Sequence, residues 1–141
     1  MKFFAFLSLF VSLVFTQDSP KVYWNSLATD VTVGVPLLDD PTLIGGRVQI
    51  KVSFNGGKSY EEMGEAFTIE KSDIDDLKNV SVSADIFEAM PGFNEGGKAQ
   101  FIAKVWDRAG NSIEGAVSDS VLSIDETVPT LVSLKNISSN E

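Results

Sequence analysis

Acidic side chains at three positions are the groups in this chain whose type and spacing could hold a metal ion. Asp107 opens a glycine-containing turn, and Asp125 and Glu126 follow the last apolar stretch before Pro129. Carboxylates and turn carbonyls are the hard oxygen ligands that Ca²⁺ prefers. We expect these positions near one end of the folded domain, which makes Asp107, Asp125 and Glu126 candidate calcium ligands. The alternative is solvated surface charge, because the sequence contains no EF-hand pattern and the acidic run 73–76 lacks the glycine and the terminal glutamate.

Catalytic side chains are scarce, because the chain contains no cysteine and no histidine. That composition excludes disulfides and thiolate chemistry, and it removes the commonest general base. Two carboxylates could act as the acid and base of a glycosidase, but with 20 acidic residues some pair will always have a suitable separation. We therefore expect a protein that is not an enzyme, with no catalytic residues and no cofactor apart from the Ca²⁺ considered above.

Length and charge narrow the class of protein further. The chain has 141 residues, 43% of them apolar, which is enough for one domain with a packed core. Its net charge of −9 disfavours a nucleic-acid partner, because phosphate backbones are bound by clustered lysine and arginine.

The first 16 residues are typical of a cleavable signal peptide. Lys2 provides a positive charge ahead of an apolar run from Phe3 to Phe15, interrupted only by two serines. A membrane-spanning helix needs roughly 20 apolar residues, so this run is too short to span and has the length of a signal-peptide core. We predict cleavage after Thr16 and export to the medium or the cell surface, with no membrane span. An uncleaved N-terminal anchor is the alternative.

Alternation of apolar and polar residues dominates the chain from Val22 onward and predicts β-strands. The clearest runs are 47–54 and 98–106, and weaker ones occur at 22–24, 31–35, 66–69, 79–84 and 113–124. Short helical turns are expected at 72–77, capped by Ser72, and at 85–90. About seven strands separated by turn signals predict an all-β fold, a β-sandwich. The residues predicted to face its core are Val48, Ile50, Val52, Phe54, Phe101, Ala103 and Val105.

Two segments have the composition of structural turns between strands. Asn55, Gly56 and Gly57 suit the positive φ angles of a hairpin turn. Residues 53–60 also resemble the Asp-box of sialidases, with Asn55 in place of the aspartate, and that motif is itself a structural hairpin. In the second segment, 107–111, Asp107 and Asn111 can bond the turn backbone while Gly110 adopts the left-handed conformation.

The sequence 105–111 followed by 123–129 resembles the end of bacterial immunoglobulin-like (Ig-like) repeats. Those repeats end in a strand, an Asp-x-Ala-Gly-Asn hairpin, a last strand and an Asp-x-Thr-x-Pro linker into the next copy. The matching residues are Asp107, Ala109, Gly110, Asn111, Asp125, Thr127 and Pro129. The resemblance implies an Ig-like sandwich over 17–125, and calcium bound between neighbouring modules is common in such arrays.

Residues 125–136 have the same order of Asp, Pro and apolar strand as residues 18–26. This internal likeness assigns residues 126–141 to a linker and the first strand of a second repeat, Leu131 to Ile137, and an irregular C-terminal tail is the alternative. The Ig-like resemblance implies a non-enzymatic structural or adhesive module of an exported, cell-surface tandem-repeat protein. Its expected partners are neighbouring Ig-like repeats and an extracellular protein or glycan.

Four aromatic residues suggest another function. A shared surface formed by Tyr23, Trp24, Tyr60 and Trp106 would stack against sugar rings, as in a carbohydrate-binding accessory module. The chain is alternatively a non-catalytic domain of a larger secreted hydrolase.

Overall fold

The structure of the chain is a computed structural model that describes residues 22–130. The predicted signal peptide and the predicted strand Leu131 to Ile137 lie outside the described residues. Within them there are nine strands rather than about seven, and no helix long and apolar enough to cross a membrane. The elements are β1 (Val22–Trp24), β2 (Asp30–Leu37), η1 (Pro41–Leu43), β3 (Arg47–Ser53), β4 (Glu61–Glu62), β5 (Phe67–Thr68), η2 (Lys71–Asp73), β6 (Asp76–Ser83), α1 (Ala84–Glu88), β7 (Lys98–Trp106), β8 (Ser112–Glu114) and β9 (Leu122–Ile124).

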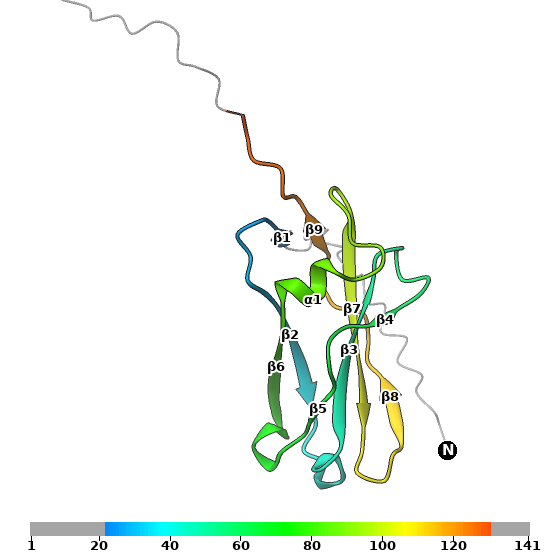
Figure 1. Cartoon of the computed structure of the whole chain (residues 1–141). Coiled ribbons are helices and arrows are strands. Elements are labelled where there is room, and N and C mark those ends of the chain that lie inside the picture. The colour runs from blue at the N-terminus through cyan, green and yellow to red at the C-terminus, as the bar shows by residue number, and fades with distance from the viewer. Residues whose placement is uncertain (1–21, 131–141) are drawn as a thin grey trace, which may run out of the picture.

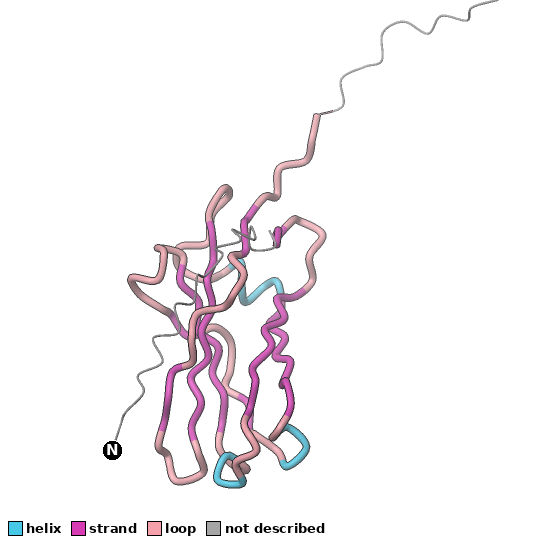
Figure 2. Tube along the Cα trace, turned by 180° about the vertical axis from the view of Figure 1, so that it is seen from behind, coloured by secondary structure: helices cyan, strands magenta, loops and turns pink. Residues whose placement is uncertain are grey.

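The strands form two sheets, which confirms the predicted all-β sandwich (Figure 1). The larger sheet has the order β1-β9-β7-β3-β4, with β5 also on β3 and β8 also on β7. The smaller sheet is the antiparallel pair β2–β6. β1 runs parallel to β9, whereas the other pairs of the larger sheet are antiparallel. The turn between β7 and β8 lies at the same end as η1 and η2 (Figure 2), and the chain leaves from the opposite end after β9.

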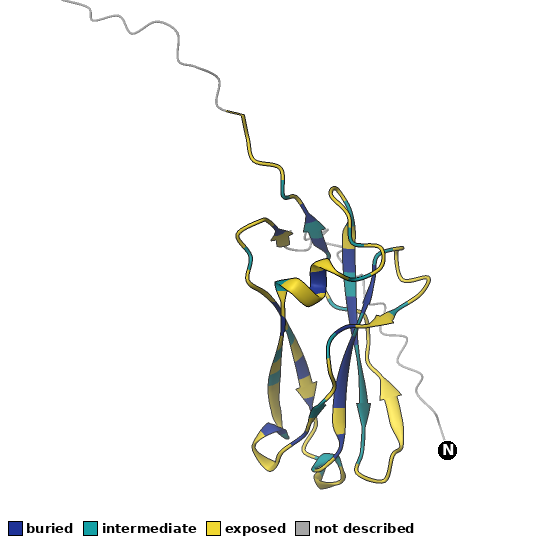
Figure 3. Cartoon of the chain, in the orientation of Figure 1, coloured by how far each residue is buried: buried dark blue, intermediate teal, exposed yellow. Residues whose placement is uncertain are grey.

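The core lies between the two sheets and includes the residues predicted from alternation (Figure 3). Four of them are buried, namely Val48, Ile50, Val52 and Phe101, while Phe54, Ala103 and Val105 are partly buried against the same cluster. At the α1 end of the sandwich the core is centred on Phe87, which belongs to α1 and is fully buried. Its ring centroid lies 4.8 Å from that of Trp24 and 5.3 Å from that of Phe93, both edge to face. α1 therefore closes one end of the sandwich with an aromatic cluster.

One of the two seams between the sheets, the one between β3 and β6, is closed by the segment 61–69. Met63 and Ile69 from this segment are each 1% exposed. The buried amide of Gln49 fastens the segment to β3, because its Nε2 donates to the carbonyl oxygens of Met63 and Gly64 at 3.2 and 3.1 Å. The chain thus covers this seam with its own side chains.

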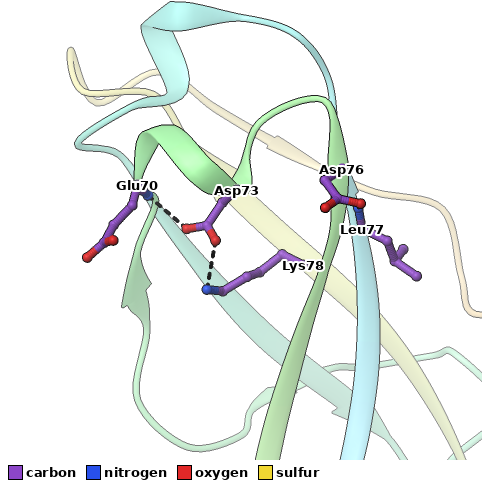
Figure 4. A network of polar contacts seen from close by, with 5 residues as sticks. All are labelled: Glu70, Asp73, Asp76, Leu77 and Lys78. Atoms are coloured by element: carbon purple, nitrogen blue, oxygen red, sulfur yellow. Dashed lines mark hydrogen bonds and ion pairs between the residues drawn. The ribbon is translucent and has the colours of Figure 1, made fainter.

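The predicted helical turn at 72–77 is wrong in its position and its cap. η2 ends at Asp73 and is capped from Glu70, and β6 already begins at Asp76 instead of residue 79. The physical reason is a polar network around the buried carboxylate of Asp73 (Figure 4), which accepts hydrogen bonds from the Glu70 N–H and from Lys78 Nζ, both at 2.8 Å. The Lys78 bond is the largest cause of a lowered Asp73 pKa. Because Lys78 belongs to β6, this network holds the turn against the start of the strand.

The predicted last strand, 113–124, is interrupted. Lys104 of β7 pairs with Glu114, and Ala99 of β7 pairs with Leu122. Between these two pairs the edge segment has more residues than β7 has, so the edge contains extra residues. Ser118 accommodates them, because its N–H donates to the Phe101 carbonyl and its hydroxyl oxygen accepts from the Phe101 N–H. A side-chain bond replaces part of the backbone ladder here, as in a bulge.

Candidate functional site

The C-terminal junction is a segment, 125–130, that leaves the sandwich after β9 and is bonded to it at two points. The Asp125 N–H donates to the carbonyl oxygen of Trp24 at 2.9 Å. Glu95 then accepts from the Glu126 N–H at 2.8 Å and from the Thr127 hydroxyl at 2.6 Å. These bonds lower the pKa of Glu95, with the Thr127 hydroxyl as the largest cause. The junction is therefore fixed to the end of the domain through Thr127.

The hairpin between β7 and β8 is built by the residues singled out in the sequence. Asp107 accepts hydrogen bonds from the Asn111 N–H and from Asn111 Nδ2, both at 2.8 Å. Gly110 has φ +93°, the left-handed conformation expected there. The Asn111 side chain is the largest cause of the lowered Asp107 pKa. Both carboxylate oxygens of Asp107 are thus occupied in the turn.

The expectation that Asp107, Asp125 and Glu126 lie near one end of the domain is wrong. Asp107 follows β7, while Asp125 follows β9, which pairs with the opposite end of β7. The strand between them has nine residues and separates them by about 30 Å. Among residues 22–130, no three acidic side chains form a group that could hold a metal ion.

The turn after β3 also has the expected backbone. Gly56 and Gly57 have φ +74° and +85°. The Asn55 side-chain oxygen accepts from the Ser53 hydroxyl at 2.8 Å and from the Ser59 N–H at 3.1 Å. The loop is wider than a two-residue hairpin, because the next strand, β4, begins only at residue 61. Asn55 organises this loop from within.

The four aromatic residues proposed as a sugar platform do not share one surface. Trp24 is buried, and its Nε1 donates to Glu88 at 3.1 Å. Trp106 is half-buried and stacks with Arg47 and Lys104, whose charged groups lie 4.2 and 4.9 Å from its ring centroid. Tyr60 has a buried hydroxyl, and Tyr23 is the one exposed ring of the four.

An apolar groove of about 910 Å³ occupies the second seam of the sandwich. Its walls are β2 on one side and β7 with the segment 113–122 on the other, and its floor includes core side chains. Residues that contribute to it are Val31, Val33, Val35, Phe101, Ala103 and Val117. At its rim Ile113 is 71% exposed and Val117 is 48% exposed. This seam, unlike the one covered by Met63 and Ile69, is open among the described residues.

The edge of β2 beside this groove presents backbone groups that are unpaired among residues 22–130. The Ala84 N–H donates to the Thr29 carbonyl, so Asp30 and Ser83 form a non-hydrogen-bonded pair. The antiparallel register then directs the backbone groups of every second residue, 30, 32, 34 and 36, away from β6. Pro36, which has no N–H, occupies one of these positions and therefore costs the β2–β6 pair nothing. Sequence reasoning missed this edge, although a proline inside an alternating strand is a signal of one.

Comparisons of the chain with protein-family models, with curated proteins and with solved structures gave no match.

Proposed function

We propose that this chain is a non-enzymatic structural or adhesive Ig-like module of an exported, cell-surface protein built from several domains. The observation that carries the proposal is the hydrogen bond from Thr127 to Glu95 at the junction. It fixes the direction in which the chain leaves the sandwich. Asp125, Thr127 and Pro129 are the linker residues of the Ig-like resemblance. A spacer module needs such a fixed exit, because the exit sets the direction of whatever follows.

The strand arrangement supports the same proposal. Ig-like domains place the second and fifth strands in one sheet and the third, sixth and seventh in the other. Here β2 and β6 form one sheet, while β3, β7 and the interrupted edge β8–β9 belong to the other. The function would then be surface presentation, with edge strands and end loops as contact sites.

The carbohydrate-binding alternative gains no support from the positions of the aromatic rings. The cations over Trp106 and the burial of Trp24 leave no flat aromatic surface that combines the four residues. A non-catalytic domain of a larger hydrolase would have the same fold and junction, so a catalytic domain encoded in the same gene would distinguish that alternative.

Export is tested by the intact mass of the protein recovered from the medium and from the surface of unbroken cells. The proposal requires a mature chain that starts near Gln17 and is accessible to an antibody on intact cells. A mass that includes residues 1–16, found only inside the cell or in its membrane, would reject export. Processing at another bond of 14–20 would shift the cleavage site and leave export intact.

A further inference from the structure

We propose that the open edge of β2 binds an extended peptide segment as an added β-strand, and that this segment is apolar at alternate positions and carries lysine or arginine. The inference rests on the proposed adhesive function and names the class of partner. Its first support is the backbone of β2. The N–H groups of Thr32 and Gly34, with the carbonyls of residues 30, 32, 34 and 36, point outward in the spacing that a partner strand needs.

The groove supplies the second support, because it can receive every other side chain of such a strand. Successive side chains of a strand point to opposite faces, so one set enters the groove and the other faces solvent. On the far seam, between β3 and β6, Met63 and Ile69 of the chain itself enter the space between the two sheets, and both are almost fully buried. On the near seam, Val31, Val33 and Val35 line the apolar groove, at whose rim Ile113 and Val117 are exposed. A strand as long as β2, eight residues, would cover it.

Charge selects the kind of segment. The charged residues among the described lining are Asp30, Asp40 and Asp119, with no lysine or arginine. A basic segment is complementary to these carboxylates. A second copy of this chain is a poorer occupant, because pairing β2 with β2 would bring the same carboxylates together on two chains that each carry a net charge of −9.

The experiment titrates the full chain with four synthetic eight-residue peptides and follows binding by calorimetry. The first, KVTVTVTK with blocked ends, is the basic probe, and the second, EVTVTVTE, reverses its charge. The third and fourth peptides are KVTVTVTK N-methylated at every second residue. One is methylated at the odd-numbered residues and the other at the even-numbered residues. N-methylation removes the N–H donors of one edge of the peptide without changing its side chains.

The matched pair of variants is Thr32→Pro and Ser81→Pro. Thr32 and Ser81 are direct cross-strand partners, and their hydroxyls lie 2.7 Å apart, so both variants lose that contact. Both also lose an outward N–H, but Thr32→Pro loses it at the groove and Ser81→Pro at the far edge of the sheet. Circular dichroism and thermal melting establish that each variant is folded before titration.

We expect the basic peptide to bind, the acidic one to bind about tenfold more weakly, and one N-methylated version alone to lose binding. Thr32→Pro should weaken binding about tenfold, whereas Ser81→Pro should change it less than about threefold. No binding of the basic peptide, equal loss with both N-methylated versions, or equal effects of the two proline variants would overturn the proposal. Concentration-dependent dimerisation through the β2 edge would also overturn it in favour of a second copy. None of these results bears on export, so the proposed function fails or stands separately.

Discussion

The carboxylate of Glu95 accepts a hydrogen bond from the hydroxyl of Thr127 at 2.6 Å, across 32 residues of chain. Glu95 belongs to the loop before β7, and Thr127 lies beyond the last strand. The same carboxylate accepts from the Glu126 N–H, so two neighbouring residues of the junction are fixed to one side chain. This relationship gives residues 125–129 a physical role, since Thr127 fastens the exit of the chain to the sandwich.

Removing the threonine hydroxyl should release the junction without unfolding the domain. In Thr127→Val we expect the backbone amides of residues 126–128 to gain fast motion, measured by ¹⁵N relaxation, while those of β7 stay unchanged. Glu95→Ala should have the same effect and Glu65→Ala, which replaces an exposed glutamate elsewhere, should have none. Unchanged order at residue 127 in both junction variants would show that Glu95 does not fix the junction.

The hairpin carboxylate predicts a pH dependence of stability. The folded state lowers the pKa of Asp107 below its ordinary value of 3.8 through the bonds from Asn111. A lowered pKa stabilises the fold above the unfolded-state pKa, and that contribution is lost as the pH falls through the folded-state pKa. The loss of stability in Asp107→Ala should therefore be present at pH 7 and shrink below about pH 4. Urea unfolding of both proteins across pH 7 to 2.5 measures it, and a difference that stays constant with pH would contradict the assignment.

Any side chain at Gly110 should destabilise the fold, for backbone reasons alone. Its φ of +93° is unfavourable for any other residue, while a Cβ there would meet no atom within 4 Å. Gly110→Ala should lower the unfolding free energy by about 1–2 kcal/mol. Gly115→Ala is the control, because its Cβ would make only an ordinary contact of 3.5 Å with the Ala103 carbonyl. Equal effects of the two substitutions in urea unfolding would contradict the strained turn.

Phe87 should be among the most sensitive positions of the core. Its side chain is 0% exposed and lies among the rings of Trp24, Phe54, Phe93 and Phe101. Phe87→Ala should cost about 3–5 kcal/mol of unfolding free energy. The neighbouring Ile86 is 43% exposed, so Ile86→Ala in the same helix should cost far less. A loss below about 1 kcal/mol for Phe87→Ala would mean that α1 does not close the core.

The strands with a long run of alternating apolar and polar residues were predictable from the sequence. β7 has the predicted bounds, Lys98–Trp106, and β3 ends one residue before the predicted Phe54. Alternation of apolar and polar residues is visible in the local sequence alone. It therefore predicts both strands and the face of each that points to the core. The contribution of α1 was not predictable in the same way, because a five-residue helix has no detectable period and Phe87 is buried by rings from distant segments.

The errors arise where non-local bonds decide the backbone. β6 begins early because Lys78 reaches the Asp73 carboxylate, and the edge strand is broken because Ser118 bonds to Phe101. The grouping of Asp107 with Asp125 failed for a simpler reason: a strand that joins two residues separates them by its own length. The groove was invisible in the sequence, because each of its walls reads as an ordinary strand.

Amide hydrogen exchange of β2 in the full chain tests the central structural claim, that one seam of the sandwich is open along this strand. The register predicts an alternating pattern, in which the N–H groups of Val33 and Val35 are bonded to β6 and exchange slowly. The N–H groups of Thr32 and Gly34 point into the open seam and should exchange far faster. Slow exchange at all four positions would show that another segment already covers the edge, and it would contradict the account of this surface as a free docking edge.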